Sequence, residues 1–306
     1  MKAIVTGGAG FIGSHLVEAL LAEGINVQVI DNLSTGNADY LPAGVPLHRM
    51  DIRSEEVREL LLRERPDVVF HHAAQVDVQR SVSDPGADAS VNIAGTANLV
   101  HACAQASVQK IIYASSCAVY GDLQTVLVHE DDPTQPISFY GISKLTPESY
   151  LRVFHRLYGL NYTILRYANV YGPRQTPKGE GGVVAICLDR LRKGLPLIVY
   201  GDGEQTRDFV YVKDVVKANL AAMHRGDWQT VQIGTAASVS VNRLVEQLQV
   251  LHGAPIAVVH RPERAGDIRH SCLSNAKAYE QLGWTADYDL VQGLKSTYEY
   301  EMRSAE

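Results

Sequence analysis

The sequence predicts an α/β fold: a Rossmann-type doubly wound parallel sheet followed by a smaller C-terminal lobe. Three observations support this prediction. Short runs rich in β-branched residues alternate with helix-length amphipathic segments through the first half of the chain. A glycine-rich segment, residues 7–13, separates the first of these runs from the first helix. Beyond Tyr171 the alternation gives way to a stretch rich in Gly and Pro.

The first half is expected to form consecutive β-α-β units. The expected strands are Lys2–Thr6, Asn26–Ile30, Val68–His72 and Lys110–Ala114, and the expected helices lie near Phe11–Glu23, Ser54–Glu64 and Ala87–Ala106. Strands joined by helices pair in parallel through right-handed crossovers, and ligands then bind beyond the carboxyl ends of the strands. Functional residues are therefore expected in the loops that follow these strands.

The second half is expected to complete this domain and to add the second lobe. A helix over Tyr140–Tyr158 and a strand over Tyr162–Arg166 end the dinucleotide-binding domain, residues 1–166, and residues 167–306 form the substrate-binding lobe. Two helices are expected in that lobe, at Val183–Lys193 and Ser240–His252. Two apolar runs are expected at Pro196–Tyr200 and Ile256–His260, and the first is followed by a loop at Gly201–Arg207. The segment near 207–235 could instead return to the first sheet, because sequence alone does not fix boundaries in wound folds.

Composition narrows the class of protein. The 306 residues are 46% hydrophobic and 20% charged, as in ordinary globular proteins. The net charge of −6, without a cluster of Lys and Arg, argues against nucleic acid as a partner. The four cysteines form no C-x-x-C pair, which argues against a zinc or redox motif and for reduced thiols in the cytoplasm. The apolar segment Ala3–Val5 is too short for a signal peptide or a membrane span.

The glycine-rich segment predicts a dinucleotide site. Gly7, Gly10 and Gly13, with Phe11 and Ile12, precede and open the first helix. At this position a pyrophosphate meets a helix N-terminus, and glycines let the backbone approach it closely. A purely structural turn is the alternative for such a motif alone.

An acidic residue at the end of the second expected strand strengthens this interpretation. Asp31 is placed to accept hydrogen bonds from both hydroxyls of the adenosine ribose. No Arg follows it, which favours NAD over NADP. Asp51 and Ile52 would lie beside the adenine, although Asp51 could instead cap the next helix.

A second motif predicts a catalytic base. Tyr140 and Lys144 are four residues apart and so lie on one face of a helix, where the ammonium lowers the phenol pKa from about 10 toward neutrality. A solvated surface pair is the alternative for this spacing alone. Ser115 and Ser116 end an expected strand, however, and strand ends in this fold face the nicotinamide.

With these motifs in place, the chain resembles the extended short-chain dehydrogenase/reductases, and within them the UDP-glucose 4-epimerase-like members of the NAD-dependent epimerase/dehydratase family. The similarity covers nearly the whole chain. It is carried by the glycine motif, Asp31–Ser34, His72–Ala74, Asn92-x-x-Gly95-Thr96, the segment around Ser116, Tyr140-x-x-x-Lys144, Arg166–Pro173 and Arg264-x-Gly266-Asp267.

The resemblance implies the roles of the catalytic residues. Tyr140 would take the proton from a sugar hydroxyl, Ser116 would hydrogen-bond the same oxygen, and Lys144 would bind the nicotinamide ribose and lower the Tyr140 pKa. Hydride would pass from sugar carbon 4 to NAD and return to the other face of a keto intermediate that has turned over. The enzyme would be an isomerase of UDP-glucose and UDP-galactose.

The resemblance also implies ligand contacts. Further cofactor contacts are implied at Asn32, Ser34, Ala73, Ala74, Asn92 and Tyr167, and substrate contacts at Asn169, Val183, Arg207, Arg264, Asp267 and Ser271. An arginine fork suits a diphosphate and a carboxylate suits ribose hydroxyls. Surface salt bridges are the alternative for the Arg and Asp residues of this set.

A homodimer is implied through the helices at Tyr140–Tyr158 and Ala87–Ala106. Tyr150, Phe154 and Tyr158, spaced four apart, belong either to this face or to the core. No metal is expected, because His71 and His72 are strand neighbours that point to opposite faces and have no apparent third ligand.

Two positions bear on the reaction and the sugar. Related dehydratases and decarboxylases carry an acid after the active-site hydroxyl, where this chain has Cys117 and Ala118, so epimerisation is favoured. The small Ser271 leaves room for an N-acetyl group at sugar carbon 2, which would admit UDP-N-acetylglucosamine and UDP-N-acetylgalactosamine.

The alternative functions are a UDP-glucuronate epimerase, another nucleotide-sugar enzyme of the same scaffold, and a non-catalytic NAD sensor. Ala114 and Pro147 depart from the family pattern, and Pro147 should cost a backbone bond or kink the helix.

Overall fold

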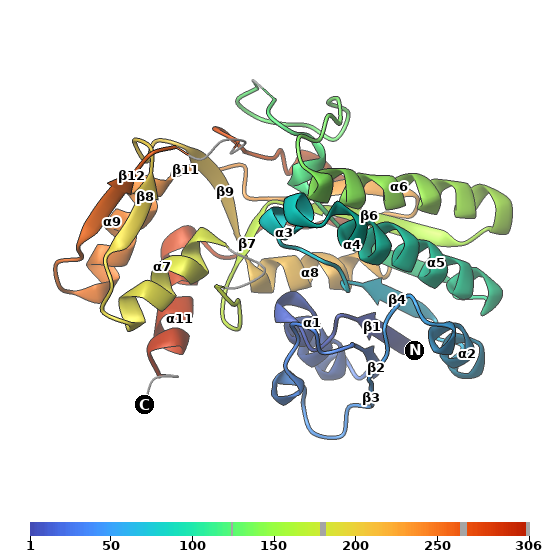
Figure 1. Ribbon diagram of the computed structural model, residues 1–306. Helices are drawn as coiled ribbons and strands as arrows, with labels where there is room; N and C mark the ends of the chain where they lie inside the picture. The colour runs from blue at the N-terminus through green and yellow to red at the C-terminus, as the bar shows by residue number, and fades with distance from the viewer. Residues whose placement is uncertain (124, 178–181, 264–267, 304–306) are drawn as a thin grey trace.

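The larger part of the molecule is a seven-stranded parallel sheet (Figure 1). The computed structural model describes all residues except 124, 178–181, 264–267 and 304–306. The strand order is β10-β6-β5-β4-β1-β2-β3. Its strands are β1 (Lys2–Thr6), β2 (Asn26–Ile30), β3 (Leu47–His48), β4 (Val68–His71), β5 (Lys110–Ser116), β6 (Asn161–Tyr167) and β10 (Gln229–Ile233). The predicted α/β class and parallel sheet are confirmed.

Helices cover both faces of this sheet. One face carries α1 (Phe11–Ala22) and α8 (Val212–Ala222), and the other carries α2 (Glu55–Glu64), α5 (Thr96–Gln105) and α6 (Phe139–Tyr158). Successive residues of β1 alternate between the faces: Val5 packs in one core with Leu16 of α1, whereas Ile4 packs in the other with Leu60 of α2. The apolar β-branched runs in the sequence follow from this burial on both sides.

The chain order changes direction at β1. From β1 the chain crosses first to β2 and β3 on one side and later to β4, β5 and β6 on the other. Such a switch point opens a crevice beyond the carboxyl ends of the central strands, where ligands bind in doubly wound sheets.

The helix predicted near Ala87–Ala106 is present and continuous, but it contains a π-helical segment that the sequence did not predict. The structure has a short helix α4 (Pro85–Ala89), a π-helical segment η2 (Ser90–Gly95) and then α5. A π-helical segment inserts an extra residue per turn, and such segments are frequent at functional sites. Asn92 lies in it and donates from Nδ2 to Oγ of Ser143 on α6, at 2.9 Å.

Helix α6 runs through Pro147 without ending. The missing N–H leaves the carbonyl of Ser143, one turn earlier, without its usual helical donor. Pro147 is buried, and the helix ends at Tyr158, followed by Gly159 as C-cap in the left-handed conformation with φ of 72°.

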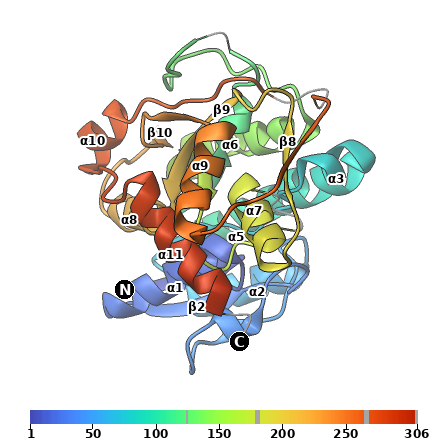
Figure 2. The ribbon, with the colours of Figure 1, turned by 90° about the vertical axis from the view of Figure 1, so that its left-hand side faces the viewer.

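The smaller lobe has its own sheets and core (Figure 2). Strands β7 (Asn169–Tyr171), β9 (Thr206–Tyr211) and β11 (Ser238–Ser240) form one sheet, and β8 (Leu197–Tyr200) pairs in parallel with β12 (Val258–Arg261). Its helices are α7 (Val183–Arg192), α9 (Val241–His252) and α11 (Leu290–Arg303). Between β9 and β11 the chain returns to the large sheet, where α8 packs on α1 and β10 pairs with β6.

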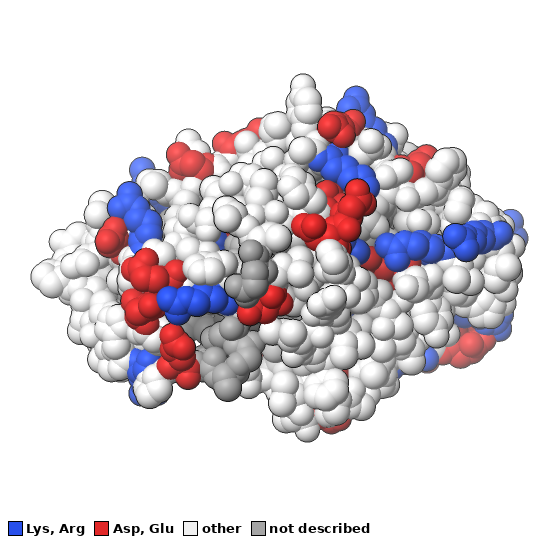
Figure 3. All heavy atoms as spheres, turned by 90° about the horizontal axis from the view of Figure 1, so that it is seen from above, with Lys and Arg blue, Asp and Glu red and all other residues white. Residues whose placement is uncertain are grey.

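The remaining elements are short, and the sequence did not predict them. They are the 3₁₀ turns η1 (Ala38–Tyr40) and η3 (Cys117–Val119) and the helices α3 (Val78–Ser83) and α10 (Ala276–Leu282). Within the described ranges, the molecule has no helix of the length and apolar character that a membrane crossing needs. Basic and acidic side chains are interspersed over the face in Figure 3, so its described residues form no extended basic area there.

Candidate active site

The glycine loop packs too closely against backbone atoms to accept side chains at Gly7 and Gly13. A Cβ atom at Gly13 would lie 2.1 Å from the Gly7 carbonyl oxygen, and one at Gly7 would lie 2.6 Å from the Ala73 nitrogen. Gly7 also has a φ of 68°, which side-chain-bearing residues rarely adopt. Gly10 occupies the N-cap of α1 and has no side chain, so the first-turn N–H groups are available to an anion.

The carboxylate of Asp31 lies at the end of β2 beside this loop. Its oxygens accept hydrogen bonds from the backbone N–H groups of Ala9 at 3.0 Å and Leu33 at 2.8 Å. Burial raises the pKa of Asp31, and these two hydrogen bonds act against that rise. The carboxylate is thus fixed in orientation and lines the cavity.

Asp51 does not cap a helix. Helix α2 begins at Glu55 with Ser54 as its N-cap, so the capping alternative is wrong. Asp51 instead accepts hydrogen bonds from Arg53 Nε at 2.8 Å and from Asn32 Nδ2 at 3.0 Å. The Arg53 guanidinium lowers the pKa of Asp51 to about 2.

A cavity of about 150 Å³ joins these groups. Among its lining residues are Gly7, Gly10, Phe11, Ile12, Gly13, Asp31, Asn32, Ser34, Asp51, Ile52, Ala73, Ala74, Tyr140, Lys144 and Tyr167, all expected from the sequence to contact a cofactor. A glycine cradle at a helix N-terminus and a carboxylate beyond the second strand are the donor and acceptor set that a dinucleotide needs. The residues present therefore fit NAD.

Asn92 is the expected cofactor residue that is not among those lining the cavity. It is 2% exposed and lies behind the wall, where its Oδ1 accepts from the backbone N–H of Gln75 at 2.8 Å. Its amide also contacts Ser143 of α6 and Asp88 of α4. Asn92 thus braces the wall of the site in this structure.

The two adjacent histidines have different surroundings. His71 is buried and its ring nitrogens are hydrogen-bonded to Thr6 Oγ1 and Thr96 Oγ1, each at 2.8 Å. His72 lines the cofactor cavity and stacks on Tyr167, with ring centroids 6.2 Å apart. Burial, and secondly the charge of Lys144, lower the pKa of His72 to about 4, so its imidazole is neutral. Within the described residues, no group of three or more His, Cys, Asp and Glu side chains is placed to hold a metal ion.

The expected catalytic residues come from two elements. Ser116 is the last residue of β5, and its Oγ accepts from the backbone N–H of Ala118 at 3.1 Å. Tyr140 and Lys144 lie in the first turns of α6, and the backbone N–H of Tyr140 donates to Ser81 Oγ at 3.1 Å. Ser116 and Tyr140 border the space between the large sheet and the smaller lobe, and Tyr140 and Lys144 line the cofactor cavity.

Lys144 is buried against aromatic and acidic neighbours. It is 4% exposed, and its Nζ lies 5.2 Å from the ring centroid of Tyr113. Burial lowers the pKa of Lys144 to about 8, while the buried carboxylate of Asp88 acts in the opposite direction. The ammonium is therefore charged at neutral pH and loses its proton in the mildly alkaline range.

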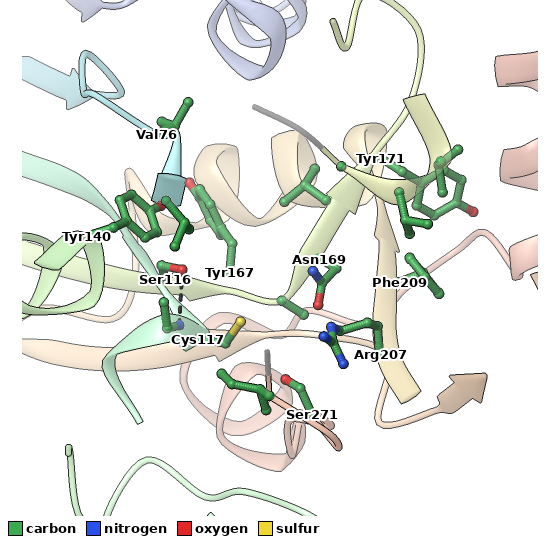
Figure 4. Close-up of a pocket in the computed structure, with 18 of the residues that line it drawn as sticks. Val76, Ser116, Cys117, Tyr140, Tyr167, Asn169, Tyr171, Arg207, Phe209 and Ser271 are labelled. Atoms are coloured by element: carbon green, nitrogen blue, oxygen red, sulfur yellow. Dashed lines mark hydrogen bonds between the residues drawn. The ribbon is translucent and has the colours of Figure 1, made fainter. Parts of the chain in front are cut away.

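A second cavity, of about 340 Å³, opens on the other side of Tyr140 (Figure 4). It shares Phe11, Ile12, Val76, Ser115, Tyr140 and Tyr167 with the cofactor cavity. Figure 4 shows Ser116 and Tyr140 toward one end and Asn169 and Arg207 toward the other. The expected substrate residues Ser116, Tyr140, Asn169, Val183, Arg207 and Ser271 all line it, whereas Arg264 and Asp267 lie outside the described residues.

The far end of this cavity is held by β9. Arg207 Nη1 donates to the Thr206 carbonyl at 2.8 Å. The next residue, Asp208, is buried and accepts from the backbone N–H groups of Thr235 at 2.8 Å and Leu273 at 3.2 Å. This carboxylate ties β9 to the segment that carries Ser271, so the two lining residues are held together.

Cys117 and Ala118 also line the substrate cavity, next to Ser116. Burial raises the pKa of the Cys117 thiol, which is therefore protonated near neutral pH. Neither side chain is an acid of useful strength.

Several apolar lining residues were missed from the sequence. They are Val76, Val78, Ile137, Phe209 and Ile268 in the substrate cavity, and Met50 and Val91 in the cofactor cavity. They belong to no motif and reach the site only through tertiary packing. His72 was expected only as part of the His72–Ala74 motif and as a rejected metal ligand, although its place directly after β4 marked it as a candidate cofactor neighbour.

Comparisons with known proteins identify the family of the chain. Residues 3–234 match the model of the NAD dependent epimerase/dehydratase family. The chain is 41% identical to the UDP-glucose 4-epimerase of Mycolicibacterium smegmatis, with 98% of each chain covered. It is 45% identical to the structure of UDP-glucose 4-epimerase with UDP-glucose from Thermotoga maritima, with a TM-score of 0.97 and both chains fully covered. The Thermus thermophilus UDP-glucose 4-epimerase complex with NAD is 41% identical, with a TM-score of 0.94 over 98% of this chain and 99% of that one. The chain therefore belongs to the NAD dependent epimerase/dehydratase family.

Proposed function

We propose that this chain is an NAD-dependent UDP-sugar 4-epimerase that interconverts UDP-glucose and UDP-galactose. One observation carries the proposal: Tyr140 borders both the cavity that fits NAD and the cavity that contains Arg207 and Ser271. A sugar carbon beside Tyr140 would thus face the cofactor. The similarity to UDP-glucose 4-epimerases over the full chain supports the same substrate class.

The chain's own residues supply the proton transfers. When bound, NAD supplies the acceptor and donor of a hydride. Tyr140 takes the proton from the 4-hydroxyl of the sugar and returns it to the same oxygen when the keto group is reduced, and Ser116 hydrogen-bonds that oxygen. Lys144, charged at neutral pH, would favour the phenolate of Tyr140 and would hold the nicotinamide ribose of bound NAD.

The positions after Ser116 favour epimerisation over elimination. A dehydratase or decarboxylase of this scaffold needs a further acid beside the active-site hydroxyl. Cys117 and Ala118 occupy the lining there, and neither transfers a proton readily at neutral pH. A redox-neutral inversion needs no such group.

The range of sugars accepted is expected to depend on the wall that Ser271 forms beside Cys117. Ser271 is small and lines the substrate cavity together with Cys117. A small side chain there leaves space for an N-acetyl group at sugar carbon 2. We therefore propose that UDP-N-acetylglucosamine and UDP-N-acetylgalactosamine are also substrates. UDP-glucuronate ranks third among the candidate substrates.

The test is to incubate the purified protein separately with UDP-glucose, UDP-N-acetylglucosamine and UDP-glucuronate, and to resolve products by chromatography and mass. Epimers of unchanged mass, without net consumption of NAD, are the expected result. A lighter product would assign a dehydratase or decarboxylase instead. Absence of any product even with added NAD would exclude the epimerase assignment and favour a non-catalytic NAD sensor.

We further propose a homodimer that forms through α5 and α6. Helix α6 exposes Ile142, Tyr150, Val153 and Leu157 between 41% and 68%, an unusual amount of apolar surface for one helix. A second copy of the chain would cover this face. Light scattering should give twice the chain mass, and Leu157→Asp should give monomers, whereas a monomeric wild type would refute the dimer.

We also propose a cellular location for the protein and a division of the chain into two binding regions. We infer a cytoplasmic location, supported by four free cysteines, three of them buried. We also propose that residues 1–166, together with the returning α8 and β10, bind NAD, and that the rest of residues 167–306 binds the nucleotide sugar.

A further inference from the structure

The two elements that carry the catalytic residues meet around a buried ion pair. Glu148, one turn beyond Lys144 on α6, is 0% exposed, and Arg166 of β6 is 4% exposed. Arg166 Nε donates to Glu148 Oε1 at 2.9 Å, and Arg166 Nη2 donates to Oε2 at 2.7 Å. This paired geometry fixes both the distance and the angle between α6 and the sheet.

The same carboxylate holds the end of β5. Ser115 Oγ donates to Glu148 Oε1 at 2.7 Å, and Ser115 directly precedes Ser116. Arg152 Nη2 donates to Oε2 at 3.1 Å, which is the fourth hydrogen bond to this carboxylate. A carboxylate has about four lone-pair sites, so Glu148 is saturated. The place of Ser116 relative to α6 therefore depends directly on Glu148.

Arg166 extends the contact to the loop after β5. Its Nη1 donates to Tyr120 Oη at 2.7 Å and to the Glu130 carbonyl at 3.3 Å. Gln232 of β10 donates to the same Tyr120 oxygen. Tyr120 follows the 3₁₀ turn η3, whose first residue, Cys117, lines the substrate cavity.

We propose that Glu148 and Arg166 are positioning residues for the epimerisation, and that their ion pair sets the distance between Ser116 and Tyr140. Neither side chain is among the residues lining the two cavities, so they act through Ser115 and α6. Small misplacements of reacting groups reduce turnover much more than binding, by as much as about 100-fold for 1 Å. This inference rests on the proposed function, because its test measures the epimerisation of a UDP-sugar.

Two variants separate positioning from stability. Glu148→Gln keeps the shape but removes the charge that faces Arg166, and we expect kcat to fall roughly 10- to 100-fold. KM and the Kd for NAD should stay within about threefold, because both ligands contact other residues. The double variant Glu148→Met with Arg166→Met leaves no unpaired buried charge, so the protein should fold while its kcat stays as low.

The same strand offers a matched control at its other end. Lys110, the first residue of β5, is 5% exposed and forms an ion pair with Asp227. The double variant Lys110→Met with Asp227→Asn removes this pair far from the catalytic residues. It should lower the melting temperature and leave kcat unchanged.

The assay is epimerisation of UDP-glucose by the whole protein, with NAD binding measured by calorimetry. Low kcat in both Glu148 variants, with near-normal KM and NAD affinity, is expected. Wild-type kcat in either variant, or an equal loss of kcat in the Lys110 control, would overturn the proposal. Failure of the wild type to turn over any UDP-sugar would instead refute the proposed function, so the two failures are distinguishable.

Discussion

The two cavities that meet at Tyr140 are built in different ways. The cofactor cavity is lined mainly by the loops after β1, β2 and β4. Its shape there depends chiefly on backbone atoms and on closely packed glycines. The substrate cavity is walled by side chains from β5, α6, β7, α7 and β9 and by Ser271, which are far apart in sequence. The first depends on local conformation and the second on how two lobes pack. Substitutions should therefore affect them differently.

The largest effect is expected where the cavities join. Tyr140→Phe removes the group that transfers the proton, so kcat should fall by about 100- to 10,000-fold. The ring remains, so NAD should bind within a few-fold of the wild-type affinity. Rapid-mixing turnover assays and NAD calorimetry on the same preparation measure both. A Phe variant with wild-type kcat would remove Tyr140 from the mechanism.

A glycine pair tests the local character of the cofactor cavity. Gly13→Ala would push a Cβ to 2.1 Å from the Gly7 carbonyl oxygen, so the loop must move, at a cost of roughly 1–3 kcal/mol in the free energy of unfolding. Gly10→Ala is the milder comparison, because its Cβ would lie 3.1 Å from that oxygen, a tight contact that a shift of a few tenths of an ångström relieves. We expect Gly13→Ala to lose both thermal stability and NAD binding, and Gly10→Ala to lose mainly NAD binding. Equal melting temperatures for the two variants would contradict the close contact at Gly13.

On the substrate side, Arg207→Ala should weaken sugar-nucleotide binding and spare the cofactor. A charge-assisted hydrogen bond contributes about 1.5–3 kcal/mol, which corresponds to a rise in KM of roughly 10- to 100-fold. Steady-state kinetics with UDP-glucose, together with NAD calorimetry, check the separation. If NAD affinity fell as far as substrate affinity, the two cavities would not be independent.

The smallest expected effect is a pH dependence at Asp31. Its pKa is raised by burial, so on acidification the carboxylate protonates at a higher pH than an ordinary aspartate. Protonation removes an acceptor for the ribose hydroxyls, so NAD affinity should fall as the pH drops through that raised pKa. The stability of the unliganded protein changes in the opposite direction: its free energy of unfolding rises as Asp31 is protonated, because protonation removes the cost of burying a charge. Calorimetry between neutral and mildly acidic pH, with Asp31→Asn as the control, should give a pH dependence only in the wild type.

The same contrast explains what the sequence predicted. The glycine loop, Asp31 and the Tyr140-x-x-x-Lys144 pair are short-range patterns, and the fold class followed from the alternation of strands and helices. The family resemblance supplied the substrate residues, because nothing local links Val183 with Ser271.

The sequence could not predict features that depend on packing. The π-helical segment η2 and the passage of α6 through Pro147 are set by neighbours such as Ser143 and Asn92. The only sequence feature of β10 is a short apolar run, which does not reveal the strand with which it pairs. The sequence therefore offered its return to the large sheet only as an alternative. Apolar lining residues such as Val76 carry no chemical signature at all.

The most direct test of the account uses UDP-glucose labelled with deuterium at sugar carbon 4. If one hydride leaves that carbon and returns to its other face, the UDP-galactose formed should keep the label at carbon 4, and its mass should equal that of the labelled substrate. Loss of the label to solvent, or a product lighter by a molecule of water, would contradict the hydride-return mechanism and the role given to Tyr140 between the two cavities.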